Sequence, residues 1–421
     1  MDVTIAAVVF LVTYAVIASD RMHKTIAALL GGLAMIVLNV INQHEAFLAV
    51  DFNVIFLLAG MMVLAGILRR TGFFQWVAIR SIKVSQGHPF RILIVLSVIT
   101  AVLSALLDNV TTVVLIAPVT LSIASILGVS PIPFLVSEIL ASNIGGTATL
   151  IGDPPNILIG SASGLDFVAF LTNMGPVALI VFVVFLLTLR LVFGGALSVH
   201  EDAREAALAL DEREVIADAA LLRRSLLVIG ATLVGFLLHG QLGYEPATIA
   251  LLGATILMLI SRIDPEAVYR EVEWPTLFFF VGLFILVEGI VHVGIIDDLA
   301  AWVFDLTAGN QAVTTLGLLW LSGIASGIVD NIPYTATMIP VVESLGADGL
   351  VIEPLWWALA LGACFGGNLT IIGASANVVV AYMAARAGQK ITFRAFLPYG
   401  ALVTFESLVI ATIYMWVRYL A

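Results

Sequence analysis

The sequence contains few charged residues and only one cysteine. Lys, Arg, Asp and Glu make up 11% of the 421 residues, while hydrophobic types make up 61%. Soluble domains are about 25% charged, so this composition excludes an ordinary soluble fold. Cys364, as the single cysteine, excludes an internal disulfide and any metal or metalloid site built from several thiolates. The 18 Lys and Arg form no basic patch, so no nucleic-acid partner is expected.

Long apolar runs dominate the sequence instead. Runs of roughly 16 to 25 residues recur from end to end, and a helix of this length crosses a bilayer. Basic residues follow the first run, residues 3–18, and do not precede it as in a secretory signal peptide. We therefore expect a retained first span and an all-α polytopic protein of the plasma (inner) membrane, with the lipid bilayer as its surroundings.

The chain contains an internal duplication. The tetrapeptide ALLG at 28–31 recurs at 250–253, an offset of 222 (250 − 28). GGTATLIGDPPN at 145–156 matches GGNLTIIGASAN at 366–377, an offset of 221 (366 − 145). A nearly constant offset over this distance predicts two related halves. We place them at residues 1–195 and 225–421, joined by a polar, partly helical cytoplasmic linker at 196–224.

Each half is predicted to contain five crossings, one re-entrant hairpin and one broken helix. The hairpin tips are Asp108-Asn109 and its repeat Asp330-Asn331. With both termini outside, this count places every Lys and Arg except Arg418 in a cytoplasmic loop, as the positive-inside rule favours. Counting the hairpin arms as full spans would separate the basic loops of the second half. An odd number of crossings also inverts one half relative to the other, as in many secondary transporters.

The polar residues inside the membrane are the candidate site. A carboxylate near the bilayer centre costs about 2.5–3.5 kcal/mol on insertion scales, so Asp108 and Asp330 are expected to have a function beyond capping a helix. Hairpin ends need cover from protein or a water-filled cavity, so the two tips should meet. The GGTATLIGDPPN break exposes carbonyl groups that suit a cation or a small polar solute. The predicted binding residues are Asp108, Asn109, Thr111, Thr147, Thr149, Asp153, Asn156, Asp330, Asn331, Asn368, Thr370, Ser375 and Asn377.

Two acids break the symmetry between the halves. Asp153 aligns with Ala374, and Glu288 aligns with Gly66. A buried carboxylate can hold and release a proton near neutral pH, so the proton-coupling candidates are Asp108, Asp330, Asp153 and Glu288. Asp153 could instead start a helix before Pro154, and Glu288 could be a structural acid. We expect no metal site and no cofactor.

The hairpin tips, the GGTATLIGDPPN break and the stretch EWPTLFFFVGLFILVEGIVHVGII at 273–296 resemble the ion transporter superfamily. They are most similar to its arsenite permease and sodium/proton antiporter branch, which includes the melanosomal P protein. The resemblance covers essentially the whole chain. It implies a scaffold part and a transport part, with the substrate held between hairpin tips and broken helices. Some arsenite permeases have a cytosolic ATPase partner, and the sequence carries no feature that indicates one or an oligomeric state.

The expected function is proton-coupled efflux of arsenite or antimonite. Trivalent arsenic at neutral pH is an uncharged trihydroxide, which hydroxyl, amide and carboxyl groups could hold without thiols. Sodium/proton antiport is the first alternative. Sodium-coupled anion symport is the second, because related dicarboxylate carriers have Ser-Asn-Thr where this chain has an acid that repels dianions.

Two other classes use similar parts. A channel pore is more often lined by rings of groups from several subunits. An intramembrane aspartyl protease needs Tyr-Asp and Gly-x-Gly-Asp contexts, which neither Asp108 nor Asp330 has. We therefore expect no enzymatic activity.

Overall fold

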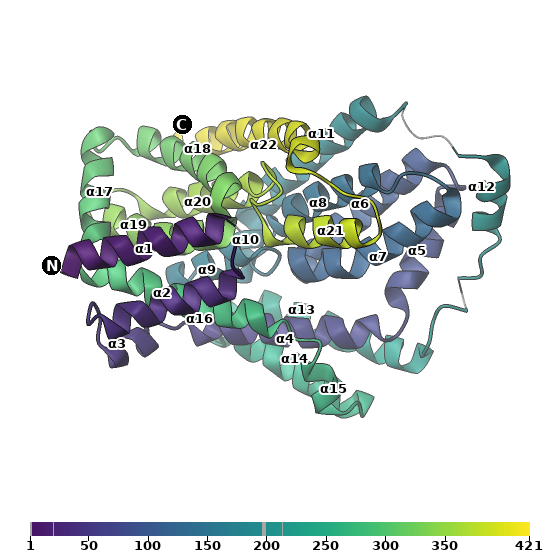
Figure 1. Ribbon diagram of the computed structural model, residues 1–421, viewed down its shortest axis with the longest axis horizontal. Helices are drawn as coiled ribbons and strands as arrows, with labels where there is room; N and C mark the ends of the chain where they lie inside the picture. Colours follow the sequence, from purple (N-terminus) through teal and green to yellow (C-terminus); the bar gives the residue numbers. More distant parts are fainter. Residues whose placement is uncertain (1, 20, 196–198, 213) are drawn as a thin grey trace.

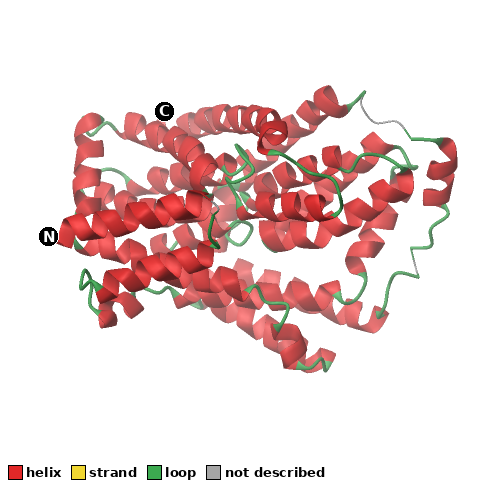
Figure 2. Cartoon of the chain, viewed as in Figure 1, coloured by secondary structure: helices red, strands yellow, loops and turns green. Residues whose placement is uncertain are grey.

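The computed structural model describes residues 2–19, 21–195, 199–212 and 214–421. Within these ranges the chain consists of helices and connecting loops, without a strand (Figure 2). The predicted all-α fold is confirmed. The helices of the first half are α1 (Asp2–Ser19), α2 (Lys24–Val37), α3 (Gln43–Leu48), α4 (Phe52–Arg69), α5 (Phe73–Val84), α6 (Pro89–Leu106), α7 (Asn109–Leu127), α8 (Ile132–Gly146), α9 (Pro154–Ser163), α10 (Phe167–Asn173) and α11 (Gly175–Phe193).

After the linker helix α12 (Glu201–Leu208), the second half repeats this order without a counterpart of α10. Its helices are α13 (Ala219–Leu242), α14 (Pro246–Ser261), α15 (Pro265–Tyr269), α16 (Trp274–His292), α17 (Ile295–Leu306), α18 (Gln311–Val329), α19 (Asn331–Ala347), α20 (Ile352–Gly366), α21 (Ser375–Arg386) and α22 (Phe393–Met415), followed by a short π-helical turn at Trp416–Leu420. The starts of α2 and α14 differ by 222 residues (246 − 24), and so do those of α4 and α16 (274 − 52). The duplication therefore extends to the positions of the helices.

A repeated glycine starts the same amphipathic helix in each half. Gly72 precedes α5 with a φ of +84°, and Gly294 precedes α17 with a φ of +80°. Residues other than glycine rarely adopt this left-handed backbone conformation. A Cβ on Gly72 would also overlap the carbonyl group of Val215. The same backbone turn is thus encoded twice.

The helices pack as two groups (Figure 1). In what we call the scaffold group, α2 packs on α16 and α14 packs on α4, with α1 and α13 beside them. Since α14 is the counterpart of α2 and α16 of α4, this is one contact made twice with the halves exchanged. In what we call the hairpin group, α6 packs on α8 and α18 packs on α20.

The two hairpins enter from opposite ends of the molecule. In Figure 1, α6 and α7 lie in the right half of the view, α18 and α19 lie in the left half, and their tips approach the middle. Both termini lie in the left half, and α12 lies at the right end. This is the arrangement expected of an inverted duplication.

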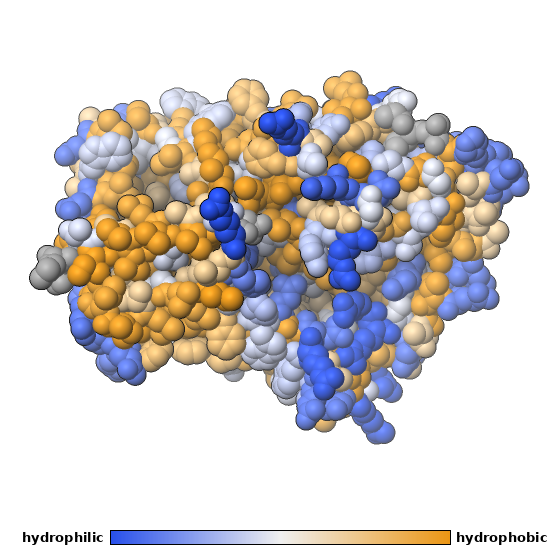
Figure 3. Space-filling model, viewed as in Figure 1, coloured by the Kyte–Doolittle hydropathy of each residue, from blue (hydrophilic) through white to orange (hydrophobic). Residues whose placement is uncertain are grey.

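Eight helical stretches of the described chain are long and apolar enough to cross a membrane, and the bent pair α9–α10 is a ninth candidate. They include the hairpin arms α6, α7 and α18, so length and composition do not separate an arm from a span. Figure 3 shows apolar surface over α1 and α2, and hydrophilic residues gathered over α15 and at the right end. Such apolar surface suits contact with lipid.

The predicted partly helical linker at 196–224 overlaps the start of α13. Asp218 accepts a hydrogen bond from the N–H group of Leu221 at 2.9 Å and caps α13, which therefore starts at Ala219. The last six residues of the predicted linker (224 − 218) belong to the first helix of the second half. Because these residues include charged side chains, hydropathy alone does not indicate that the helix begins here. Residues 196–198 and 213 of the linker lie outside the described ranges.

Candidate functional site

Each hairpin turns at an aspartate that caps its second arm. Asp108 Oδ1 accepts a hydrogen bond from the N–H group of Thr111 at 2.7 Å. Asp330 Oδ1 accepts one from the N–H group of Ile332 at 3.1 Å. Both aspartates are buried. Capping accounts for one oxygen of each carboxyl group, so the second oxygen remains to be explained.

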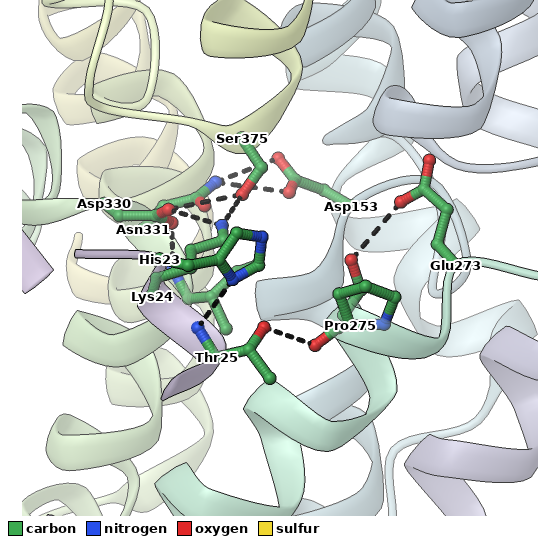
Figure 4. A network of polar contacts seen from close by, with 11 residues as sticks. His23, Lys24, Thr25, Asp153, Glu273, Pro275, Asp330, Asn331 and Ser375 are labelled. Atoms are coloured by element: carbon green, nitrogen blue, oxygen red, sulfur yellow. Dashed lines mark hydrogen bonds and ion pairs between the residues drawn. The ribbon is translucent and has the colours of Figure 1, made fainter. Parts of the chain in front are cut away.

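The two tips meet at Asp153, the acid found in one half alone. The side-chain nitrogens of Asn109 and Asn331 each lie 3.2 Å from Asp153 Oδ1, and Asn331 also lies 3.5 Å from Oδ2. Asp153 is completely buried. Figure 4 shows Asn331 pointing toward it from the second hairpin. One carboxyl group from the first broken helix is therefore shared by both hairpins, and the tips converge as the sequence predicts.

The asparagines of the two breaks hold their own backbone. Asn156 Nδ2 donates to the carbonyl oxygens of Thr147 at 3.2 Å and Thr149 at 2.8 Å. Asn377 Nδ2 donates to the carbonyl oxygens of Gly367 at 2.7 Å and Thr370 at 2.9 Å. These amides shape the loops and leave other groups to face a solute.

The threonine hydroxyls of the breaks are also engaged. Thr149 donates to the carbonyl oxygen of Ala105, and Thr370 to that of Gly327, both at 2.6 Å. These two bonds join each break to the first arm of its own hairpin. Thr147 donates to the carbonyl oxygen of Asn143 at 2.7 Å. The structure thus gives the three predicted threonines of the breaks a positioning role.

Glycines let each broken backbone pass close to itself. A Cβ on Gly152 would lie 2.5 Å from the carbonyl oxygen of Gly146 and 2.9 Å from that of Ser104. A Cβ on Gly373 would lie 2.8 Å from the carbonyl oxygen of Gly367, the equivalent contact in the second half. Real Cβ atoms do not approach backbone this closely, so the break requires glycine.

Asn143 is a site residue that the sequence reading missed. Its Nδ2 donates to Oδ1 of Asn368 and of Asn377, both at 2.9 Å, and its Oδ1 accepts from Asn109 at 3.0 Å. At the offset of 221 its counterpart is Cys364, whose Sγ lies 3.3 Å from Asn156 Oδ1. Each half therefore reaches from just before its break to the break asparagine of the other half. Aligning Asn143 with Cys364 was the signal that could have found this contact.

Lys24 is the second missed residue. Its Nζ lies 3.1 Å from Asp330 Oδ2 and also donates a hydrogen bond to Ser375 Oγ (Figure 4). Ser375 in turn donates to Asp330 Oδ2 at 3.2 Å. These groups line a cavity of about 400 Å³, together with Glu273 and Thr276. The ion pair therefore joins the first half of the chain to the tip of the second hairpin.

Glu273 is the third missed residue. It precedes α16 and its Oε2 accepts a hydrogen bond from the Thr276 hydroxyl at 3.3 Å. Burial, followed by the negative charge of Asp108, raises the pKa of Glu273 above its ordinary value of 4.5, while Thr276 and Lys24 lower it. Its counterpart at the offset of 222 is Asp51, which caps α4. Because Glu273 does not cap α16, its carboxyl group faces the cavity.

The remaining candidates lie at different distances from the tips. Asn368 accepts from Asn143 inside the network. Thr111 borders a small cavity of about 40 Å³ that Glu273 also lines. Glu288 lies on α16, is partly exposed, and is roughly 18 Å further along the helix than Thr276. The structure therefore separates Glu288 from the other coupling candidates.

Two buried oxygens at the first tip have no hydrogen-bond partner in the described protein. They are Asp108 Oδ2 and Asn109 Oδ1. Among the described residues no group of three or more His, Cys, Asp or Glu is arranged to hold a metal ion. The first tip therefore offers oxygen acceptors to a proton, a single cation or a hydroxyl-bearing solute.

Comparisons with known proteins agree with this architecture. Residues 14–362 match the CitMHS family, described as citrate transporter. The chain is 46% identical over 423 residues to a transporter of Mycobacterium tuberculosis, covering 99% of this chain and 98% of that protein. It is 34% identical over 507 residues to the human P protein, covering 99% of this chain and 60% of that one. This relation confirms the resemblance to the P protein seen in the sequence.

A solved structure supports the same fold. The YdaH transporter of Alcanivorax borkumensis matches with a TM-score of 0.52 at 17% identity, over 86% of this chain and 84% of that one. At this identity the match shows a shared fold alone. Together with the helical spans, the comparisons identify the chain as a multi-pass membrane transporter that belongs to the CitMHS, or citrate transporter, family.

Proposed function

We propose that this transporter couples the outward movement of arsenite or antimonite to the inward movement of protons. The observation that supports coupling is the excess of acids around the tips. Asp108, Asp153, Glu273 and Asp330 surround the centre, and within the described part of the chain Lys24 is the one cationic side chain that forms an ion pair with any of them. Fully ionised, this set carries a net charge of −3 (1 − 4). Buried carboxylates cannot all stay charged in a medium of low dielectric constant, so the set must bind protons or cations.

The remaining polar groups suit a small neutral solute. Asp108 Oδ2 and Asn109 Oδ1 are acceptors for hydroxyl groups, and the Lys24 side of the cavity adds donors. Trivalent arsenic as the trihydroxide carries three hydroxyl groups and no charge. Cys364 is buried and its thiol already donates a hydrogen bond to Asn156, so transport would proceed without an arsenic–sulfur bond.

Sodium/proton antiport is the second candidate function. The two oxygens without partners at the first tip favour it, because sodium prefers hard oxygen ligands, as other hard cations do. In that case the same acids would alternate between a sodium ion and protons. The antiporter would need no further solute.

Sodium-coupled symport of an anion is the third candidate function. The description of the family as citrate transporter favours it, and so does Lys24 at the cavity. The ammonium group of Lys24 is already paired with Asp330, however, and three further carboxyl groups surround the tips. A citrate-like anion would therefore have to arrive with bound cations or protons.

Everted membrane vesicles with an imposed pH gradient separate the three functions. We expect accumulation of arsenite that a protonophore abolishes and that Asp108→Asn and Asp330→Asn each remove. Asp218→Asn, which changes the helix cap of α13 outside the site, is the matched control and should behave as wild type.

Each alternative predicts a different result in these vesicles. Sodium-driven proton movement without arsenite would replace the proposal with antiport, and sodium-dependent citrate uptake would replace it with symport. Arsenite uptake that requires ATP in the presence of the protonophore would indicate a cytosolic ATPase partner. We also propose that both termini face outward and the linker faces the cytoplasm, which protease accessibility of terminal tags in the same vesicles would test.

A further inference from the structure

Three groups of the described chain surround the ammonium group of Lys24. Nζ lies 3.1 Å from Asp330 Oδ2, bonds Ser375 Oγ, and lies 5.0 Å from the centroid of the Phe279 ring. A carboxylate, a hydroxyl and an aromatic face together form a cation-binding environment. Figure 4 shows the lysine reaching from α2 to the start of α19 and to Ser375 at the start of α21.

The first half has no counterpart of this environment. At the offset of 222, Lys24 corresponds to Pro246 and Phe279 to Leu57. At the offset of 221, Ser375 corresponds to Pro154. A proline or a leucine supplies neither a positive charge nor a hydroxyl. The charge of Asp330 is therefore balanced by the protein itself, whereas Asp108 Oδ2 has no hydrogen-bond partner in the described chain.

The two tips also differ in backbone conformation. Asp108 is extended, with a φ of −163°, but Asp330 has a φ of +108°. A non-glycine residue is strained at such a positive φ, and this backbone conformation persists only where surrounding contacts hold it. The Lys24 and Ser375 contacts fix the Asp330 carboxyl group. Lys24 belongs to the scaffold group while Asp330 and Ser375 belong to the hairpin group, so this ion pair also joins the two groups.

We propose that Lys24 is a tethered cation that permanently fills the cation position of the second hairpin, so that an exchangeable cation or proton enters at Asp108 of the first hairpin. This inference rests on the proposed ion coupling and holds for any of the solutes considered above. It makes Lys24 the residue that sets how many free cations the transporter can bind. Removing its charge should create a second site for a free cation.

Thermal unfolding of the purified full-length protein in different salts tests this inference. The salts are sodium, lithium and potassium chloride, with choline chloride as the ionic-strength control, each at about 150 mM. In Lys24→Gln we expect an alkali-cation-dependent rise in Tm that exceeds the wild-type rise by at least about 2 °C. The double variant Lys24→Gln/Asp330→Asn should lose this gain. A purely structural role for Lys24 would lower Tm equally in all four salts.

Two outcomes would overturn the inference. One is a Lys24→Gln protein whose Tm responds to the four salts as wild type does. The other is an equal gain in the double variant, which would place the new cation away from Asp330.

Acylation of lysines in intact protein, followed by mass spectrometry, covers the case in which Lys24→Gln does not fold. Lys24 should react more slowly than exposed Lys390 in wild type, and Asp330→Asn should remove this protection. Equal reactivity of the two lysines in wild type would also reject the ion pair. Neither measurement uses transport, so loss of the proposed function in vesicles and loss of this inference are separate results.

Discussion

Asp153→Asn is predicted to abolish proton coupling while leaving the fold intact. Asp153 is completely buried, and its Oδ1 accepts hydrogen bonds from Asn109 and Asn331, both at 3.2 Å. An asparagine with its carbonyl oxygen at the same place accepts the same two bonds. The substitution therefore removes a group that can bind a proton and preserves the contacts that hold the tips together.

Two opposing free-energy terms determine how much the substitution changes the stability of the protein. A hydrogen bond to a charged group contributes about 1.5–3 kcal/mol, so two contribute about 3–6 kcal/mol. Burying a carboxylate costs several kcal/mol. These two terms oppose each other, so a substitution that weakens both changes the stability by less than either term alone. In the asparagine variant both terms shrink, and we expect the free energy of unfolding to change by less than about 2 kcal/mol.

The assay combines transport with stability. Arsenite accumulation in everted vesicles under an imposed pH gradient should fall by more than about tenfold. The Tm of the purified variant should change by only a few degrees, and Asp218→Asn should leave both quantities unchanged. Accumulation with wild-type pH dependence would refute the coupling role of Asp153. A large loss of Tm together with lost transport would show that the carboxylate is needed to hold the tips.

Three further predictions concern the structure around the site. Asn143→Ala removes three hydrogen bonds and leaves the side-chain oxygens of Asn368 and Asn377 unpaired, so it should lower the free energy of unfolding by about 2–5 kcal/mol. Its counterpart Cys364→Ala loses one weak thiol hydrogen bond and should lower the free energy of unfolding by less than about 1 kcal/mol. Thermal unfolding of the two variants tests this difference. Gly152→Ala would place a Cβ 2.5 Å from a carbonyl oxygen and should cost about 1–3 kcal/mol or prevent folding, while at Gly175 the nearest atom is 3.6 Å away and alanine should be tolerated; equal Tm values would contradict the tight crossing. Because the pKa of Glu273 is raised in the folded state, its contribution to stability is complete below pH 4.5 and is lost as the pH rises through the raised pKa. Glu273→Gln should therefore flatten the decline of Tm with pH above pH 4.5. An unchanged slope would show that the proton affinity of Glu273 is the same in the folded and unfolded states.

The sequence alone was sufficient for the repeat and for the positions of the two tips and two breaks, which the structure brings together. The offset located both hairpin tips and both breaks, because a duplicated chain repeats its helix caps and glycines at fixed positions. Asp108 and Asp330 could be recognised since an acid inside an apolar run is costly. The start of α13 was missed because a capping aspartate, Asp218, sets it among charged residues.

Contacts between the halves could not be predicted in the same way. Lys24 follows the first span, where positive charges are ordinary, and only the fold brings it beside Asp330, 306 residues away. Glu273 looks like a residue that starts a helix, as its counterpart Asp51 does. Asn143 lies in a helical run, where its alignment with Cys364 is the one sequence feature that could have marked it. Each of these side chains obtains its role from a partner in the other half of the chain.

Under the proposed coupling, the differences between the halves matter more for transport than their similarity. A carrier with two identical, oppositely oriented halves would present the same energies from either side of the membrane. The duplicated backbone supplies two equivalent turns, and departures from the repeat give them different charges. Lys24 balances Asp330, Glu273 adds an acid beside the same cavity, and Asp153 joins both tips from one half. Asp108, whose second oxygen has no hydrogen-bond partner in the described chain, is then the group at which gain or loss of a cation changes the charge of the centre most directly.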